Sequence, residues 1–421
     1  MSEWKELKIE DFCEVIGGGT PSTKEYSYYG GEISWITPRD LTNYKKRFIL
    51  RGERNITELG LKNSSARILP KNSILLTSRA PIGYLAIAEK EVCTNQGFKS
   101  LVINPEKADY NFVYYLIKSN VERIKGLGTG TTFAEISGSV VKNLKFSLPD
   151  LQTQTNIAKI LSSLDDKIEL NNKINHELET LAQTLFKQWF IDYEFPNENG
   201  EPYKSSGGEM VESELGEIPK GWEVKRLDEI SSEITRGYTT KYVEKSNIIN
   251  LNQKVNRGVH LDKSNFKYYP NDTVVPENKF VRQKDILINS LGQGTLGRIH
   301  FYKENSTNVV IDQHITILRG NNEQFLPEIL YLMLTFNSNQ KRLEEMVTGS
   351  TGMLMLNINK IREFKVVVPP IEHQKLLNNN IVPSFENINC NILENEQLIS
   401  LRDTLLPKLI TGELKVNEIN N

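Results

Sequence analysis

Residues 146–154 read Phe-Ser-Leu-Pro-Asp-Leu-Gln-Thr-Gln, and residues 366–374 read Val-Val-Val-Pro-Pro-Ile-Glu-His-Gln. Each stretch places an apolar residue first, a proline three positions later and a glutamine five positions after the proline. Proline in this setting is typical of the start of a helix, and a helix-periodic apolar run follows in both places. The two stretches therefore predict that one structural unit, a domain followed by a long helix, occurs twice in the chain.

Four further blocks repeat in the same order at an almost constant shift of 217 to 220 residues. Trp4-x4-Ile9-x2-Phe12 corresponds to Trp222-x4-Leu227-x2-Ile230. The other three pairs are residues 94–98 with 311–315, 112–116 with 329–333, and 128–132 with 348–352. Convergent core patterns rarely keep this many blocks in register, and the period is far too long for a solenoid. We therefore predict a duplication.

Length and composition agree with a globular, multidomain protein. The 421 residues suggest two or three domains, and 38% hydrophobic with 25% charged residues allows packed cores. The three cysteines, Cys13, Cys93 and Cys390, are widely spaced, which argues against a disulfide scaffold or a zinc site. No apolar run approaches 18 residues and the start lacks an apolar signal segment, so we expect a soluble, cytoplasmic protein without a membrane partner.

The expected fold class is mixed α/β (α+β). Residues 1–150 and 221–370 contain short β-rich runs between Gly, Pro and Asn signals, and residues 151–194 and 371–413 have helical spacing. So long and narrow an apolar stripe needs a partner helix, and we expect the two helices to pair as an antiparallel coiled coil with pseudo-two-fold symmetry. The expected seam residues are Ile157, Leu161, Leu164, Ile168, Leu178, Leu185, Ile388, Ile392, Leu398 and Leu405.

Two details qualify this helical part. Leu181 and Leu401 fall in the same apolar stripes, whereas Asn171, Asn172 and Asn175 interrupt the first stripe, and buried asparagine can fix the register of a coiled coil. The alternative is that each amphipathic helix packs only on its own domain.

Residues 195–220 are acidic and almost free of large apolar side chains, so they should form an exposed, flexible linker.

Charge is distributed unevenly, although the net charge is only −2 from 51 basic and 53 acidic residues. Residues 37–88 contain ten Lys or Arg against three acids, and residues 236–298 contain eleven against five. Residues 150–218 contain five against fourteen. Solvated surface faces could produce such clusters. Two basic segments at matching places in a repeat favour an anionic partner instead.

Catalytic and metal-binding motifs were not found in the sequence. It contains no Gly-x4-Gly-Lys phosphate loop, no His-Glu-x-x-His and no Asn-Pro-Pro-aromatic, and Pro149-Asp150 has no Glu-x-Lys at nuclease distance. We therefore predict no catalytic residues, no metal site and no cofactor, which favours a binding module.

Several stretches resemble the specificity subunits of Type I restriction-modification systems. Residues 18–22 (Gly-Gly-Thr-Pro-Ser), 29–31 (Tyr-Gly-Gly) and 33–41 (Ile-Ser-Trp-Ile-Thr-Pro-Arg-Asp-Leu) resemble the opening of a target-recognition domain of that family. Residues 161–171 and 185–190 resemble the ends of its spacer helix, 215–222 the entry to its second domain, and 401–409 its C-terminal helix end. The resemblance covers nearly the whole chain, including the duplication.

The resemblance implies a non-catalytic subunit in which two target-recognition domains read a bipartite, asymmetric site in double-stranded DNA. It implies as partners two methyltransferase (modification) subunits and, through that methyltransferase core, restriction (endonuclease/translocase) subunits. The second domain departs from the first: residues 78–83 (Ser-Arg-Ala-Pro-Ile-Gly) become 290–297 (Ser-Leu-Gly-Gln-Gly-Thr-Leu-Gly), and the Thr37–Leu41 run finds no clear counterpart. Different half-sites are therefore expected.

The candidate DNA contacts are cations, amides and small hydroxyls in the basic segments and Gly-rich loops. Lys and Arg neutralise phosphates, and Arg or Gln side chains can read base edges. Each has a plainer alternative, a solvated charge or a tight turn, and Trp35 and Trp222 are expected in the core. The candidates are Arg39, Lys45, Lys46, Arg79, Thr129, Thr131, Thr132, Arg236, Lys241, Lys254, Arg257, Gln293, Ser350 and Thr351.

The rival hypothesis is a non-catalytic helical scaffold that binds protein partners or another anionic ligand, and salt-dependent DNA binding distinguishes the two. If the helices hold the domains a rigid distance apart, half-sites on one face of B-DNA should lie about one turn, roughly 10 bp, centre to centre. Half-sites of about 3–5 bp would then leave a gap of about 5–8 bp.

Overall fold

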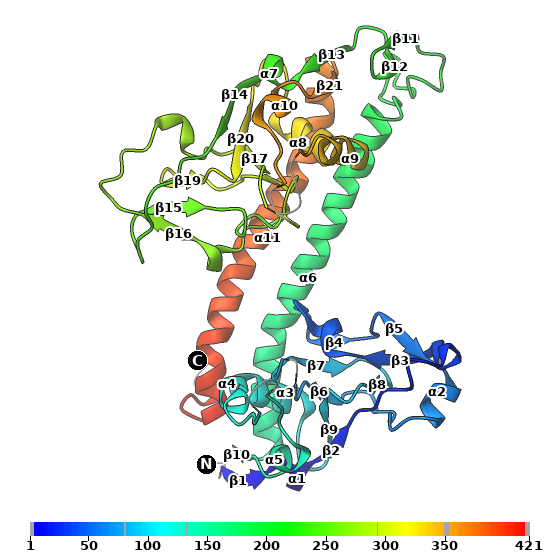
Figure 1. Cartoon of the computed structure of the whole chain (residues 1–421), viewed down its shortest axis with the longest axis vertical. Coiled ribbons are helices and arrows are strands. Elements are labelled where there is room, and N and C mark those ends of the chain that lie inside the picture. Colours follow the sequence, from blue (N-terminus) through cyan, green and yellow to red (C-terminus); the bar gives the residue numbers. More distant parts are fainter. Residues whose placement is uncertain (1–3, 80, 131–133, 293, 349–353, 417–421) are drawn as a thin grey trace. The chain divides into compact units, whose positions relative to one another are not determined.

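The computed structural model describes residues 4–79, 81–130, 134–292, 294–348 and 354–416 (Figure 1). Its contacts divide the chain into two units, the first made of residues 1–173 and 392–421 and the second of residues 174–391. Each unit holds one mixed α/β domain and one half of each of two long helices, α6 (Leu151–Phe190) and α11 (Ile371–Thr411). These helices begin where the proline signals predict and end within four residues of the expected bounds.

The first domain is built on a five-stranded sheet in the order β2-β9-β6-β7-β4, with a three-stranded sheet β5-β3-β8 and the pair β1-β10. Its strands are β1 (Lys5–Lys8), β2 (Cys13–Gly17), β3 (Tyr29–Ile36), β4 (Phe48–Ile49), β5 (Arg54–Ile56), β6 (Ile74–Leu76), β7 (Leu85–Ala88), β8 (Cys93–Thr94), β9 (Lys99–Ile103) and β10 (Lys145–Leu148). Its helices are α1 (Ile9–Phe12), η1 (Tyr26–Tyr28), η2 (Pro38–Leu41), α2 (Glu58–Lys62), α3 (Tyr110–Ser119), α4 (Val121–Lys125) and α5 (Gly138–Lys142).

The second domain repeats this plan with a four-stranded sheet β14-β20-β17-β18, a three-stranded sheet β16-β15-β19 and the pair β13-β21. Its strands are β13 (Glu223–Arg226), β14 (Ser231–Arg236), β15 (Ile248–Leu251), β16 (Lys267–Tyr269), β17 (Ile286–Asn289), β18 (Ile299–Phe301), β19 (Val309–Ile311), β20 (Ile315–Gly320) and β21 (Lys365–Val368). Its helices are α7 (Leu227–Ile230), η3 (Lys263–Asn265), η4 (Glu277–Lys279), α8 (Pro327–Thr335), α9 (Asn337–Glu345) and α10 (Ile358–Arg362).

Strand pairing shows that the domains are two copies of one fold. β2 pairs antiparallel with β9 as β14 does with β20, and β3 pairs parallel with β8 as β15 does with β19. β1 pairs antiparallel with β10 as β13 does with β21. The predicted duplication and the mixed α/β class are therefore confirmed.

The repeated proline-glutamine motif ties each domain to its helix. The side-chain amide of Gln154 donates to Pro149 O at 2.9 Å, and its oxygen accepts from Asp109 N at 3.1 Å, at the N-cap of α3. Gln374 does the same with Pro369 O at 2.8 Å and Leu326 N at 2.9 Å, at the N-cap of α8. Both glutamines are buried, so each long helix starts at a fixed place on its domain.

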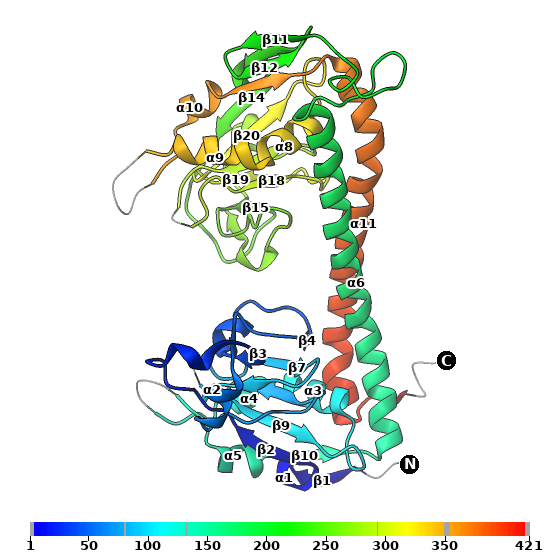
Figure 2. The ribbon, with the colours of Figure 1, turned by 90° about the vertical axis from the view of Figure 1, so that its right-hand side faces the viewer.

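Apolar burial joins the helices to the domains as well as to each other. Figure 2 shows the first domain (blue to cyan) against the start of α6 (green) and the end of α11 (red). Ile157 and Leu161 of α6 and Leu409 of α11 share one core with Phe112 and Tyr115 of α3. In the second unit, Ala182, Phe186 and Phe190 of α6 and Leu377 and Ile381 of α11 belong to the core of the second domain.

The helix segments run antiparallel within each unit. In the first unit, Asp165 contacts Arg402, and Asn171, farther along α6, donates to Asn395, earlier in α11, at 2.9 Å. In the second unit, Asn391 donates to Asn175 at 2.8 Å. Because 171 and 391, and likewise 175 and 395, are equivalent positions of the repeat, the same asparagine pair occurs in both units. The predicted register role of these asparagines thus has a structural basis.

The residues expected in the seam differ in their burial, and their pairing across the seam stays a prediction. Among its residues, Ile157, Leu161, Ile168 and Ile388 are buried, and the other six are partly buried: Leu164, Leu178, Leu185, Ile392, Leu398 and Leu405. Leu181 and Leu401, assigned to the same stripes, are wrong, because their exposed fractions are 50% and 47%. The next residue in each helix, Ala182 or Arg402, takes the inner face, since the helices must also cover the domain cores.

The expected flexible linker at 195–220 also needs correction. Phe195 is buried, with its ring stacked 5.1 Å from that of Trp222 and 4.6 Å from that of Tyr203. Farther along, β11 (Met210–Ser213) and β12 (Gly216–Pro219) form an antiparallel hairpin, and Ile218 joins the second core. The segment has few large apolar residues, but those it has are enough to fasten it to the second domain.

No helix in the part of the chain that the structure describes is long and apolar enough to cross a membrane. Within the same residues, no group of three or more His, Cys, Asp or Glu side chains could hold a metal ion.

Candidate nucleic-acid interface

Three neighbouring segments of the first domain carry the polar side chains that could meet a nucleic acid. Ser78 N, after β6, donates to Gly97 O in the β8–β9 turn at 2.7 Å. Gly97 in turn lies against η2, so closely that an added Cβ would stand 2.9 Å from Pro38 Cγ. The residues adjoining these contact points are Arg79, Gln96 and Arg39. We call them the first recognition row.

Arg39 is more exposed than Arg79, the other cation of this row. Asp40 holds η2 in shape, because its carboxylate accepts from Thr37 N and from Glu53 N, each at 2.7 Å. The Arg39 side chain is 84% exposed, and its one ion pair in the described structure is a long contact of 3.8 Å with Glu53. Its guanidinium is therefore available to an anion in solution.

Gln96 sits at the tip of a structured turn. Asn95 Oδ1 accepts from Gly97 N at 2.9 Å, which shapes the turn, and the Gln96 side-chain oxygen accepts from the Thr20 hydroxyl. Gln96 is exposed. Its amide can thus be presented in a preferred orientation.

Arg79 is held by a carboxylate. Its Nη1 lies 3.4 Å from Glu135 Oε2, and Lys99 Nζ lies 3.6 Å from the other oxygen of Glu135. The backbone of Glu135 exchanges hydrogen bonds with Thr129 at 3.1 and 3.0 Å. The Arg79 side chain remains 35% exposed.

The second domain presents a matching row. Asn95 N donates to Ile36 O at 3.0 Å in the first domain, and Asp312 N donates to Leu251 O at 3.1 Å in the second. Ile36 and Leu251 are therefore equivalent, and Arg39, three positions on, corresponds to Lys254. The Thr37–Leu41 run thus has a structural counterpart in 252–256, which corrects the sequence comparison.

The other two positions follow in the same way. Ser290 N donates to His314 O at 2.7 Å, as Ser78 N does to Gly97 O. Gln313 therefore corresponds to Gln96, and Leu291 to Arg79. Lys254, Gln313 and Leu291 form the second recognition row. The contacts predicted from the sequence include neither glutamine, although Gln is the one identical residue between 94–98 and 311–315.

The other residues predicted to contact DNA differ in exposure and in whether an ion pair already holds them. Lys45 and Lys46 are exposed between η2 and β4, Lys241 is exposed after β14, and Thr129 is exposed beside Glu135. Arg257 is exposed but paired with Asp262 at 3.2 Å. Thr131, Thr132, Gln293, Ser350 and Thr351 lie outside the described residues.

Arg236 occupies a structural position. It donates to Leu356 O at 2.6 Å and lies 3.5 Å from Met355 Sδ, and its buried Nε has no partner among the described residues. Burial lowers the pKa of its guanidinium. These contacts brace the loop before α10, and a direct DNA contact by Arg236 stays a prediction.

Some residues of the basic segments and both candidate tryptophans belong to the interior. Arg47 is buried against α6, where it pairs with Asp166 and its backbone N donates to Glu169 at 2.9 Å. Trp35 donates from its ring N to Gly19 O at 3.0 Å, and Trp35 and Trp222 are each 4% exposed. The tryptophans are therefore core residues, as expected.

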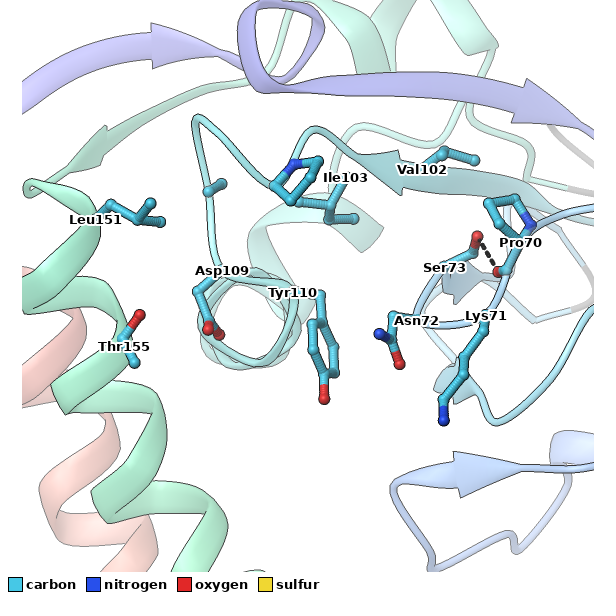
Figure 3. A pocket seen from close by; sticks show the side chains of 12 residues that line it. Pro70, Lys71, Asn72, Ser73, Val102, Ile103, Asp109, Tyr110, Leu151 and Thr155 are labelled. Carbon is cyan, nitrogen blue, oxygen red and sulfur yellow. Dashed lines mark hydrogen bonds between the residues drawn. The ribbon is translucent and has the colours of Figure 1, made fainter.

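A pocket of about 400 Å³ lies at the start of β6, whereas Arg79 of the row follows the end of that strand. Figure 3 shows side chains that line this pocket. Lys71 and Asn72 before β6, Tyr110 of α3 and Thr155 of α6 line it, and Ser73 closes its turn by donating to Pro70 O at 2.7 Å. None of the predicted DNA contacts lines it. Lys71 is therefore a useful reference cation remote from the row.

A duplicated α/β domain that presents cations and amides at matching backbone positions is suited to a protein that recognises nucleic acid with two domains. The family described as the Type I restriction modification DNA specificity domain matches residues 1–180 and 219–401. The chain belongs to this family.

Individual relatives support this assignment over the full length. The Type I restriction enzyme MjaIX specificity subunit of Methanocaldococcus jannaschii is 37% identical, over 99% of this chain and 95% of its own. The HindI specificity subunit of Haemophilus influenzae is 26% identical, over 98% of this chain and all of its own. The crystal structure of the M. genitalium Type I S subunit has the same fold, with a TM-score of 0.61 at 19% identity, covering 97% of this chain and 96% of its own.

Replacing Lys46 by alanine should weaken binding to every DNA sequence alike. The side chain is exposed between η2 and β4, where it can neutralise a phosphate, and phosphate contacts carry no sequence information. The slope of log affinity against log salt should fall by about one. Lys71→Ala, at the far end of β6, is the matched control and should leave the slope unchanged. Equal effects of the two changes would show that Lys46 acts only through net charge.

Proposed function

We propose that this chain is the sequence-specific DNA-recognition subunit of a Type I restriction-modification complex, and that its two domains read two different half-sites. The observation that carries the proposal is the pair of matching rows, Arg39–Gln96–Arg79 and Lys254–Gln313–Leu291. Two copies of one domain that keep a cation and an amide at the same backbone positions are suited to the phosphates common to any two half-sites. Their third positions differ, as asymmetric recognition requires.

The partners follow from family membership and from the surface of the helices. We propose that two methyltransferase subunits dock on the long helices and that restriction subunits join through this methyltransferase core, in the cytoplasm where the DNA lies. Exposed apolar side chains are available for burial by a partner protein, which is favourable. Five leucines with exposed fractions between 45% and 51% support such docking: Leu170, Leu181, Leu376, Leu393 and Leu401.

In this proposal the chain supplies recognition and the methyltransferase subunits supply chemistry. The test compares three samples, each with labelled S-adenosylmethionine and DNA: the pure chain, the methyltransferase subunits alone and the two together. Methyl transfer to a split, asymmetric site is expected only in the combined sample. Robust incorporation by the pure chain, or salt-independent DNA binding by the complex, would refute the proposal.

A further inference from the structure

The two recognition rows differ at one position, and that difference extends to its surroundings. Arg79 is bridged through the backbone to Glu135, and its counterpart Leu291 is bridged in the same way to Met355. Thr129 and Thr348 make the equivalent second bridge. The backbone frame is therefore the same in both domains, and only the side chains on it have changed.

The exchange replaces charge by apolar surface. In the first domain, Lys99 completes the cluster, since its Nζ approaches Glu135 at 3.6 Å. Lys99 pairs with Gly17 in β2, and Thr316 pairs with Arg236 in β14, so Thr316 stands at the position of Lys99. Two cations and a carboxylate in the first domain are thus replaced, at the equivalent positions of the second domain, by a leucine, a methionine and a buried threonine.

The comparison of the two recognition rows distinguishes positions suited to DNA contacts that are independent of sequence from positions suited to contacts that depend on it. The sugar-phosphate backbone is alike in every half-site, so positions that keep their chemistry in both domains suit phosphates: Arg39 with Lys254, and Gln96 with Gln313. At a position where the side chain differs between the domains but the surrounding backbone is the same, a contact with the base edges is favoured, because the base edges differ between the two half-sites. Arg79 and Leu291 occupy such a position.

The geometry around Arg79 favours a base contact. Glu135 holds the guanidinium from one side at 3.4 Å, which restricts its rotamers, while 35% of the side chain stays exposed. A guanidinium held in this way can offer two parallel donors to O6 and N7 of guanine, the commonest specific contact of arginine. A contact to phosphate would not need an orienting carboxylate.

The second domain offers the apolar alternative. Leu291 and Met355 are both partly exposed and adjoin through their backbone bridge. Arg236 fixes this surface from below, with Nη1 3.5 Å from Met355 Sδ and Nη2 2.6 Å from Leu356 O. An apolar surface in the major groove recognises the methyl group of thymine.

Building on the proposed function, we propose that this shared position sets specificity in both half-sites: Arg79, oriented by Glu135, reads a guanine in the first, and Leu291 with Met355 reads a thymine methyl in the second. Arg39, Lys254, Gln96 and Gln313 make the contacts that do not depend on sequence.

The test uses the complete methyltransferase complex and the split site that it methylates. Each guanine of the first half-site is replaced in turn by 7-deazaguanine, which lacks N7, and each thymine of the second by uracil, which lacks the methyl group. The unaltered complex should lose affinity at one guanine and at one thymine. Arg79→Ala should itself weaken binding about 5- to 150-fold and no longer respond to the deazaguanine. Leu291→Ala should no longer respond to the uracil.

Two further variants decide the role of Arg79. Arg79→Lys keeps the charge and loses the planar fork; because lysine can also donate to O6 and N7 of guanine, it should retain non-specific affinity and only part of the guanine preference. Arg39→Ala is the phosphate-contact control and should weaken all DNA alike while the response to deazaguanine persists. If Arg79→Ala still responds to deazaguanine, the inference is overturned although the split site stands. A complex that recognises no split site overturns the proposed function itself.

Discussion

Replacing Arg402 by alanine should lower the free energy of unfolding of the first unit by about 3–5 kcal/mol. Arg402 of α11 donates to Asp165 Oδ1 of α6 at 2.6 Å, and the Asp165 side chain is only 6% exposed. Tyr115 donates to the other oxygen at 2.7 Å, and Lys118 lies 3.9 Å away. Without Arg402 the carboxylate would stay buried and lose its shortest charged contact.

The second unit provides the matched control. Phe385 and Ala182 stand at the positions of Asp165 and Arg402 in the repeat, and both are buried. Leu332 stands at the position of Tyr115, whose hydroxyl bonds to Asp165. The triple change Tyr115→Leu, Asp165→Phe and Arg402→Ala copies this apolar solution without leaving that hydroxyl unpaired, and should restore most of the lost stability. Denaturant unfolding followed by circular dichroism measures both variants. An unchanged midpoint in Arg402→Ala, or a triple variant as unstable as the single one, would contradict the assignment.

The same pair should give the first unit an acid-sensitive stability. Burial opposes ionisation of Asp165, but Lys118, the Tyr115 hydroxyl and Arg402 outweigh it and lower the pKa of the carboxyl. A group whose pKa is lowered on folding stabilises the protein above its unfolded pKa, and this stability is lost as pH falls through the folded value. Replacing Arg402 by alanine should therefore reduce the fall in the free energy of unfolding of the first unit as the pH is lowered.

Exchanging the first domain should rewrite one half-site completely and leave the other half-site and the gap unchanged. We expect this because each domain has its own recognition row and its own core. The junction belongs between Leu148, where β10 ends, and Leu151, where α6 begins. Residues 1–148 of the chain would be replaced by the matching domain of the M. jannaschii relative, with Pro149 and Gln154 retained. Since specific binding exceeds non-specific binding by about 10³- to 10⁷-fold, methylation at the original site should disappear.

Methylation mapping across a host genome measures this exchange. The reciprocal hybrid, with the second domain replaced instead, is the control and should alter the other half-site alone. A palindromic or continuous site in the native chain, or a hybrid that changes both half-sites, would show that the two domains do not read DNA separately.

Several features could be predicted from sequence because local patterns cause them. Proline before an apolar periodic run starts α6 and α11, and the order of five repeated blocks required a duplicated domain. Family resemblance supplied the function, and the basic segments located the candidate contacts. Arg39, Lys46 and Lys254 are exposed, as those segments suggested.

Other features could not be predicted, because they depend on partners far away in the chain. Arg47 and Arg236 look like free cations in sequence, yet the first is buried on α6 and the second bonds to Leu356, 120 residues later. Phe195 looks like part of a linker until Trp222 and Tyr203 stack on it. Leu181 and Leu401 fit a helical stripe but face outward.

The sequence by itself thus determined that two similar domains and two long helices exist, because helix starts, strand runs and repeats depend on neighbouring residues. Only the tertiary structure decided which residues of the two domains are equivalent. Backbone hydrogen bonds such as Asn95 N to Ile36 O and Asp312 N to Leu251 O join segments about 60 residues apart. Such bonds show that Arg39 is equivalent to Lys254, and Arg79 to Leu291. Side chains at such places share no local pattern, since strand pairing and close packing, and not their order along the chain, bring them to the same position.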